Sequence, residues 1–250
     1  HWPDSMATYM TGDNILFSND AFGQHYATEM LFNDLVDQCD LFQESLKYFA
    51  NILTPFNPIL RKKLDEVIAL NLPIDIIATS HGVVWRDNPI QIVEKYISWA
   101  NDYQENQITI IYDTMWNGTK ELAERIAEGI KLQDEKVTVK VFNLAKSDLN
   151  DIVTEVFKSK AVAVGSPTIG NDILHSVAAF IHYIKSMKFK NKKFAAFGCY
   201  GWSGESVKVI SELMVDAGFE KISGGYRNQW NPDENTKKEA IELGKQIAKL

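Results

Sequence analysis

Cysteine is scarce in this chain. Its 250 residues include only Cys39 and Cys199, which lie far apart and form no Cys-x-x-Cys pair. This pattern excludes a disulfide framework and a cysteine-based zinc knuckle, and it is typical of a reducing environment. Long apolar runs are also missing, since none approaches the ~20 residues of a membrane-spanning helix. No signal peptide is visible either, so we expect a cytoplasmic protein that does not enter a membrane.

Positively charged residues are also fewer than negatively charged ones. The chain carries 26 Lys and Arg residues against 33 Asp and Glu, which gives a formal net charge of −7. This balance argues against a nucleic-acid or anionic-membrane surface. A hydrophobic fraction of 45% with 24% charged residues is ordinary for a globular protein. The length suits one or two domains.

The segment 107–130 organises the second half of the chain. Ile108–Tyr112 is an apolar, β-branched run that predicts a buried strand. A polar turn, Asp113–Thr119, leads into a helix with apolar residues at helical spacing. A strand, a turn and a helix N-terminus together form a cradle for an anion, to which Thr114 and Thr119 can add hydroxyl donors.

The same turn lacks the usual nucleotide-binding motifs. It has neither Gly-x-Gly-x-x-Gly nor Gly-Lys-Ser/Thr, and it contains no Lys or Arg. Neutral donors suit the phosphate of a resident monophosphate such as FMN. The run Thr-x-x-Asn-Gly-Thr, residues 114–119, resembles the phosphate loop of flavodoxins. A well-capped helix without a ligand is the alternative interpretation.

From residue 108 onwards, strand and helix patterns alternate five times. Such alternation predicts an α/β fold with a parallel sheet covered by helices on both faces, here the five-stranded flavodoxin-like order 2-1-3-4-5. Ligands of such sheets bind at the carboxyl ends of the strands. The loops after the first, third and fourth strands should therefore line one site. The predicted strands are 108–112, 137–142, 161–165, 194–199 and 220–226, and the predicted helices are 118–132, 148–158, 172–186, 204–217 and 233–249.

The first hundred residues have a different pattern. A hairpin, two helices, a strand and a last helix are predicted here, the strands over 6–10, 15–18 and 74–78 and the helices over 41–53, 57–70 and 89–102. The polar segment 101–107 is the expected boundary, and we divide the chain into domains at 1–104 and 105–250. His1, Asp20 and His81 are metal candidates, because Asp20 and His81 each follow a predicted strand and imidazole with carboxylate suits Fe, Zn or Mn. His25 lies close by in sequence, and unrelated surface histidines remain the alternative.

Three segments resemble the flavodiiron proteins, or A-type flavoproteins. They are HWPDSM at residues 1–6, LFSNDAFGQH at 16–25 and ATSHGVVWR at 78–86, and the second half looks like the same family in the same order. The likeness is strongest to the rubredoxin:oxygen oxidoreductase and flavorubredoxin branch. It implies that a flavodoxin-like domain follows the C-terminal half of a metallo-β-lactamase-like αββα domain.

The resemblance implies the activity and the site residues. Family members take electrons from rubredoxin or a similar donor through FMN to two non-haem irons, which reduce O2 to water or NO to N2O, and this sequence does not distinguish the two gases. His1, Asp20 and His81 match iron ligands, and His25 matches a histidine near the diiron pocket that we assign a catalytic role. A head-to-tail homodimer or a dimer of dimers is implied as well. The FMN contacts map onto Thr114, Met115, Trp116, Asn117, Gly118, Thr119, Ser166, Pro167, Thr168, Ile169, Asn171, Tyr200, Gly201, Trp202, Ser203 and Gly204.

The chain departs from the family at its start. The His-x-Glu-x-Asp-His motif that supplies the other iron ligands is absent, and the sequence begins at His1 without a Met. We therefore expect a chain that lacks its N-terminal part, with the remaining ligands in that part. No Cys-rich module precedes Leu250, so a separate electron donor is expected. Two alternatives stay open: an FMN electron carrier without a working metal site, and a zinc hydrolase of the metallo-β-lactamase type.

Overall fold

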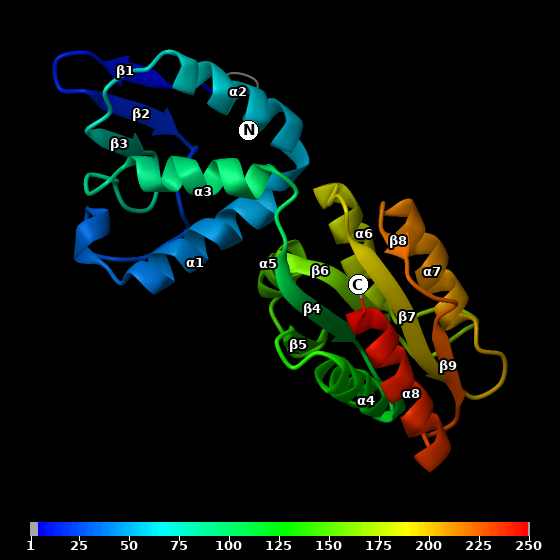
Figure 1. The fold of residues 1–250 in the computed structure, drawn as a ribbon. Coiled ribbons are helices and arrows are strands. Elements are labelled where there is room, and N and C mark those ends of the chain that lie inside the picture. The colour runs from blue at the N-terminus through cyan, green and yellow to red at the C-terminus, as the bar shows by residue number, and fades with distance from the viewer. Residues whose placement is uncertain (1–4, 250) are drawn as a thin grey trace. The chain divides into compact units, whose positions relative to one another are not determined.

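The computed structural model describes residues 5–249 and divides into two compact units, with the boundary between Tyr103 and Gln104 (Figure 1). Each unit has its own sheet. Within the described residues, no helix is both long and apolar enough to span a membrane.

The first unit contains a mixed sheet of three strands in the order β1-β2-β3. Strands β1 (Thr8–Met10) and β2 (Ile15–Asn19) form the predicted antiparallel hairpin. Strand β3 (Ile76–Thr79) pairs with β2 in parallel, with an irregularity between Phe17 and Asn19. This small mixed sheet fits one half of a metallo-β-lactamase-like domain, as the sequence predicted.

The helices of the first unit cover its aromatic core. Tyr96 and Trp85 are fully buried, and both bind the backbone of Phe22: the Phe22 N–H donates to the Tyr96 hydroxyl at 3.0 Å, and the Trp85 indole donates to the Phe22 carbonyl at 2.9 Å. These bonds fix the segment between β2 and Gln24. The helical elements are η1 (Asn33–Leu35), α1 (Gln38–Tyr48), η2 (Phe49–Leu53), η3 (Thr54–Phe56), α2 (Asn57–Ala69) and α3 (Ile90–Ala100).

The first predicted helix, 41–53, is not a single α-helix. Its last turn, Phe49–Leu53, widens into a π-helix. The Thr54 hydroxyl bonds back to the carbonyls of Phe49 and Ala50, and Pro55 has no N–H to continue the helix. The wider turn therefore follows from side-chain competition for backbone carbonyls, which the hydrophobic pattern does not reveal.

The second unit has the predicted flavodoxin-like sheet. Its strand order is β5-β4-β6-β7-β8, which corresponds to the predicted order 2-1-3-4-5, and every pairing is parallel. The fifth strand differs from the prediction because it is split into β8 and β9, both paired with β7. The strands are β4 (Glu105–Tyr112), β5 (Thr138–Asn143), β6 (Ser159–Gly165), β7 (Lys193–Tyr200), β8 (Glu220–Lys221) and β9 (Tyr226–Gln229).

Helices cover both faces of this sheet (Figure 1). On one face, apolar side chains of α4 and α8 form a continuous core with alternate residues of the central strands, such as Ile108, Ala163 and Phe197. The residues between them point the other way, because side chains alternate along a strand. The helices are α4 (Gly118–Gln133), α5 (Leu149–Lys158), α6 (His175–Met187), α7 (Ser206–Asp216) and α8 (Glu234–Ala248).

Helices α4 and α8 approach each other at two glycines. A Cβ placed on Gly129 would lie 2.0 Å from the Ile241 carbonyl oxygen, and one on Gly244 would lie 2.2 Å from the Ile126 carbonyl oxygen. Both neighbours are backbone atoms, so a side chain at either position forces the helices apart.

We predict that Gly129→Ala lowers the free energy of unfolding of the second unit by about 1–2 kcal/mol, since overpacking outweighs the gain of about 1 kcal/mol in helix propensity. Urea denaturation followed by circular dichroism measures the change. Gly224→Ala is the matched control, because a Cβ there meets nothing within 4 Å. A stabilising Gly129→Ala substitution would contradict the close helix contact.

Candidate functional site

The turn after β4 leaves polar groups without partners. Asn117, at φ +65°, precedes helix α4, and no side chain in the described part of the chain caps the first turn. The hydroxyl oxygens of Thr114 and Thr119 are buried. That of Thr114 has no hydrogen-bond partner among residues 5–249, and that of Thr119 has only the Cys199 thiol, a weak hydrogen-bonding group. Buried hydroxyls and an uncapped helix N-terminus need an acceptor. The turn therefore suits an anion with several oxygen atoms.

The loop after β6 is held rigidly beside this turn. The Ser166 hydroxyl donates to the Pro167 carbonyl at 2.8 Å and accepts the Leu174 N–H at 2.9 Å, so it stabilises the loop itself. The Thr168 N–H donates to the Cys199 carbonyl at 2.9 Å, which ties this loop to the end of β7. These bonds fix the backbone at the carboxyl ends of β6 and β7.

Aromatic side chains surround the loop after β7. Trp202 is 91% exposed, and its ring lies 6.0 Å from that of Trp230, which follows β9. A Cβ on Gly201 would lie 3.2 Å from the Trp230 ring, so this glycine allows the close approach. Exposed tryptophans at a cavity mouth provide flat apolar faces that a planar ring can cover.

These loops enclose a cavity of about 400 Å³ in the second unit. Predicted residues from all three loops line it: Thr114, Met115, Trp116, Gly118, Thr119, Pro167, Thr168, Tyr200, Gly201 and Trp202. The other predicted residues, Asn117, Ser166, Ile169, Asn171, Ser203 and Gly204, lie in the same loops but do not line this cavity. The topology thus brings the three segments together at one edge of the sheet.

Three further residues line the cavity and were not predicted. Cys199 ends β7, and Trp230 and Asn231 follow the split fifth strand. The loop after the fifth strand also lies at the carboxyl edge of the sheet. The prediction ends the fifth strand at residue 226, whereas β9 continues to Gln229, so no sequence pattern pointed to Trp230 as a cavity residue.

The Cys199 thiol faces this cavity from its base. It is 9% exposed, and burial raises the pKa of the thiol to about 11. A thiol with a raised pKa stays protonated at neutral pH and is a poor nucleophile. Cys199 therefore lines the cavity as an unreactive thiol.

In the first unit, the structure brings Asp20, His25 and His81 together. His81 Nε2 lies 3.7 Å from Asp20 Oδ1, and the rings of His25 and His81 are 5.3 Å apart. The Ser80 hydroxyl donates to Asp20 Oδ1 at 3.0 Å. His1 lies outside the described residues. Within residues 5–249 there is no cluster of three or more His, Cys, Asp or Glu side chains suited to a metal ion.

A backbone carbonyl orients the His81 ring. Its Nδ1 lies 3.3 Å from the Gln24 carbonyl oxygen, which can only accept a hydrogen bond, so this nitrogen carries the proton. Nε2 then presents its lone pair toward Asp20 and toward the Tyr48 hydroxyl at 3.3 Å. Metal-binding histidines commonly donate their other N–H to a carbonyl. Asp20 and His81 therefore fit as two ligands of a metal site.

Tyr48 completes the surroundings of His81. Its ring contacts those of both His25 and His81, at 5.0 Å in each case. Burial, together with the negative charge of Asp20, raises the pKa of the Tyr48 phenol to about 12. The phenol therefore keeps its proton at physiological pH and can donate it to His81 Nε2.

Comparison with known proteins shows the family to which this chain belongs. The flavodoxin family profile matches residues 110–244, more than half of the chain. This chain belongs to the flavodoxin family. Over its whole length it is also related to flavodiiron proteins, which confirms the resemblance seen in the sequence.

The curated relatives include the anaerobic nitric oxide reductase flavorubredoxins of Vibrio vulnificus and Escherichia coli K12, both 53% identical. All of this chain is matched, but only 50% and 52% of the relatives, so the chain spans about half their length. Rubredoxin oxygen:oxidoreductase from Desulfovibrio gigas superposes with a TM-score of 0.95 at 34% identity, covering 100% of this chain and 62% of that one. The Giardia intestinalis flavodiiron protein gives 0.94 at 31% identity, covering 100% and 61%.

We predict that iodoacetamide at pH 8 alkylates Cys199 at least about a hundredfold more slowly than the exposed Cys39, because burial keeps the Cys199 thiol protonated. The Cys199 rate should keep rising as the pH approaches 11. Peptide mass spectrometry at timed intervals measures both rates, and the Cys39→Ser variant isolates the slow one. Equal rates at the two cysteines would contradict the buried position.

Proposed function

We propose that the second unit binds FMN in the cavity between the β4, β6, β7 and β9 loops. The main support is the pair of buried hydroxyls of Thr114 and Thr119 at an uncapped helix N-terminus, since among the described residues Thr114 has no partner and Thr119 only the weakly bonding Cys199 thiol. A phosphate dianion accepts hydrogen bonds from such hydroxyls and from the first-turn N–H groups of α4. No Lys or Arg lines the cavity, so neutral donors hold the phosphate.

The aromatic residues at the cavity mouth would hold the ring system. Tyr200 and Trp202 lie on the loop after β7, and Trp116 and Met115 lie beside the phosphate turn. Their flat apolar surfaces would exclude water from the ring faces. Backbone groups of the β6 loop would bond the polar ring edge, and the hydrogen bonds of Ser166 and Thr168 that hold this loop support that role.

The whole protein is proposed to be a flavodiiron oxidoreductase. FMN held by the second unit would supply electron transfer from a donor such as rubredoxin, and a pair of non-haem irons held by the first unit and the further ligands would supply the reduction of O2 to water or NO to N2O. The relatives' names, nitric oxide reductase flavorubredoxin and rubredoxin oxygen:oxidoreductase, support this activity and this class of donor. The alternatives of an electron carrier without a metal site and of a zinc hydrolase have no comparable support.

The iron site is proposed to lie in residues 1–104. Asp20 and His81 would be ligands, and His25 and Tyr48 would surround them. His1 is proposed as a third ligand on the sequence motif alone. The remaining ligands would come from the part of the flavodiiron relatives that this chain does not span. A cytoplasmic, homodimeric protein, with FMN bound by residues 105–250, completes the proposal.

We predict that Thr119→Val raises the dissociation constant for FMN about tenfold, because one hydrogen bond to the phosphate is lost. The dissociation constant for riboflavin, which has no phosphate, should stay unchanged. Quenching of flavin fluorescence measures both constants. Without flavin, the variant should be nearly as stable as the parent protein, since the hydroxyl it removes interacts only weakly there, with the Cys199 thiol.

Thr138→Val is the control, since this threonine is exposed on the edge strand β5. It should leave both dissociation constants unchanged. If Thr119→Val weakened FMN and riboflavin equally, the hydroxyl would not be a phosphate contact.

We predict that His81→Ala, made in the full-length protein that contains this chain, abolishes reduction of NO and O2 but leaves FMN reduction by the donor intact. The physical reason is that His81 belongs to the first unit, whereas all the residues that line the flavin cavity belong to the second unit. Iron content and gas-consumption rates are measured on the same sample.

His182→Ala is the matched control, because His182 is exposed on α6 of the second unit. It should retain full iron content and full activity. Full gas reduction in His81→Ala would show that the metal site is elsewhere.

A further inference from the structure

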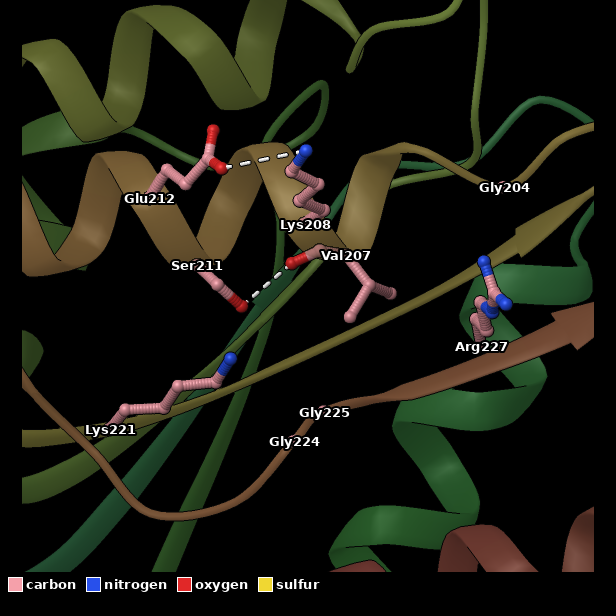
Figure 2. Close-up of a pocket in the computed structure, with 9 residues that line it drawn as sticks. All are labelled: Gly204, Val207, Lys208, Ser211, Glu212, Lys221, Gly224, Gly225 and Arg227. Carbon is pink, nitrogen blue, oxygen red and sulfur yellow. Dashed lines mark hydrogen bonds and ion pairs between the residues drawn. The ribbon is translucent and has the colours of Figure 1, made fainter.

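A second cavity of the flavodoxin-type unit lies between α7 and the split edge strand (Figure 2). Its volume is about 360 Å³. It shares no lining residue with the proposed flavin cavity. Its lining residues are Gly204, Val207, Lys208, Ser211, Glu212, Lys221, Gly224, Gly225 and Arg227.

The cavity exists because the fifth strand is interrupted. Between the pairs Phe194–Lys221 and Phe197–Tyr226, β7 advances by two residues, Ala195 and Ala196, whereas the edge strand needs four, 222–225. The edge strand therefore has two residues more than β7 over this stretch, and they form a bulge outside the strand pairing. Gly225, at φ +82°, allows this path, since a Cβ there would lie 2.6 Å from Val207 Cγ1. Bulges of this kind often lie next to binding sites.

The cavity is cationic in an otherwise acidic protein. Lys208, Lys221 and Arg227 line it with one carboxylate, Glu212, so the side chains supply a net charge of +2 in a chain of net −7. Glu212 and Lys208 form only a loose pair at 3.9 Å, with both side chains mostly exposed. Such pairs contribute little and leave Lys208 able to turn toward a ligand.

The two remaining cations stand at opposite ends of the cavity. Figure 2 shows the Lys221 side chain extending from the edge strand toward α7, with Arg227 at the far end and Val207 between them. The Ser211 hydroxyl donates to the Val207 carbonyl at 2.7 Å, so its hydrogen is not available to a ligand. Binding of a ligand would therefore depend on the cationic side chains of the cavity, and Val207 would provide an apolar contact.

We propose that this cavity binds a small phosphate-bearing molecule. A phosphate group carries a charge of about −2 near neutral pH, which matches the net charge of the lining. The planar fork of Arg227 fits two phosphate oxygens. The volume lies at the lower end of the roughly 300–1,000 Å³ found for small-molecule sites, and its concave shape favours a small ligand over a flat protein surface.

The cavity also contacts the wall of the proposed flavin site. The Arg227 guanidinium carbon lies 5.7 Å from the centre of the Tyr200 ring, and a Cβ on Gly204 would lie 3.0 Å from the same ring. Tyr200 lines the flavin cavity. A ligand that draws Arg227 away from Tyr200 would change the surroundings of that ring. The binding proposal itself does not depend on flavin.

Inorganic pyrophosphate, titrated into the 250-residue chain by calorimetry, tests the proposal. The titration is done with and without saturating FMN, which occupies the phosphate turn after β4 if that turn binds it. Pyrophosphate should bind the cavity between α7 and the edge strand both with and without FMN. On binding, the Gly224 and Gly225 amide signals should shift in ¹H–¹⁵N spectra. Lys221→Ala and Arg227→Gln should each raise the dissociation constant about tenfold.

Lys140→Ala is the matched control, because Lys140 is exposed on β5, the opposite edge strand of the same sheet. It should leave the dissociation constant unchanged. Three results would overturn the proposal: no pyrophosphate binding, binding that FMN abolishes, or binding that is equal in the control and in both cavity variants. Binding of a short polyglutamate peptide without pyrophosphate binding would also overturn it and point to an acidic partner protein.

Discussion

The parallel register of β4, β6 and β7 is the constraint on which the second unit depends. Tyr112 pairs with Gly165, and Gly165 pairs with Phe197, so β4 and β6 end at the same level and β7 continues past them to Tyr200. Their loops consequently meet at one edge of the sheet, where the Thr114 and Thr119 hydroxyls lie beside the β6 and β7 loops. Side-chain alternation on these strands buries one set of residues against α4 and α8, and this core keeps the register fixed.

Much of this arrangement could be predicted from the sequence. The β-branched run at Ile108–Tyr112 and the strand–helix alternation were sufficient for the strand order, because crossover connections in parallel sheets follow few topologies. The split of the fifth strand could not be predicted, since it depends on the contact of Gly225 with Val207 across the fold. The cavity contacts of Trp230 were missed for the same reason, as its position follows from that strand.

For the metal candidates, sequence motifs predicted the residues themselves but not the groups that orient them. Sequence motifs selected Asp20 and His81, and the structure places them 3.7 Å apart although they are far apart in the chain. The carbonyl of Gln24 that orients His81, and the phenol of Tyr48 that faces its Nε2, could not be found from spacing, because both contacts depend on how β2, β3 and α1 pack. The placement of Asp20 and His81 is consistent with the proposal that further ligands in a longer protein complete a metal site.

The cofactor content of the purified protein tests the central claim most directly. Flavin extracted from a sample of known intact mass is identified by chromatography, and iron and zinc are measured in the same sample. We expect one FMN per chain, with iron present only when the further ligands are part of the protein. A sample that contains zinc and neither contains nor takes up FMN would contradict the account and favour a hydrolase.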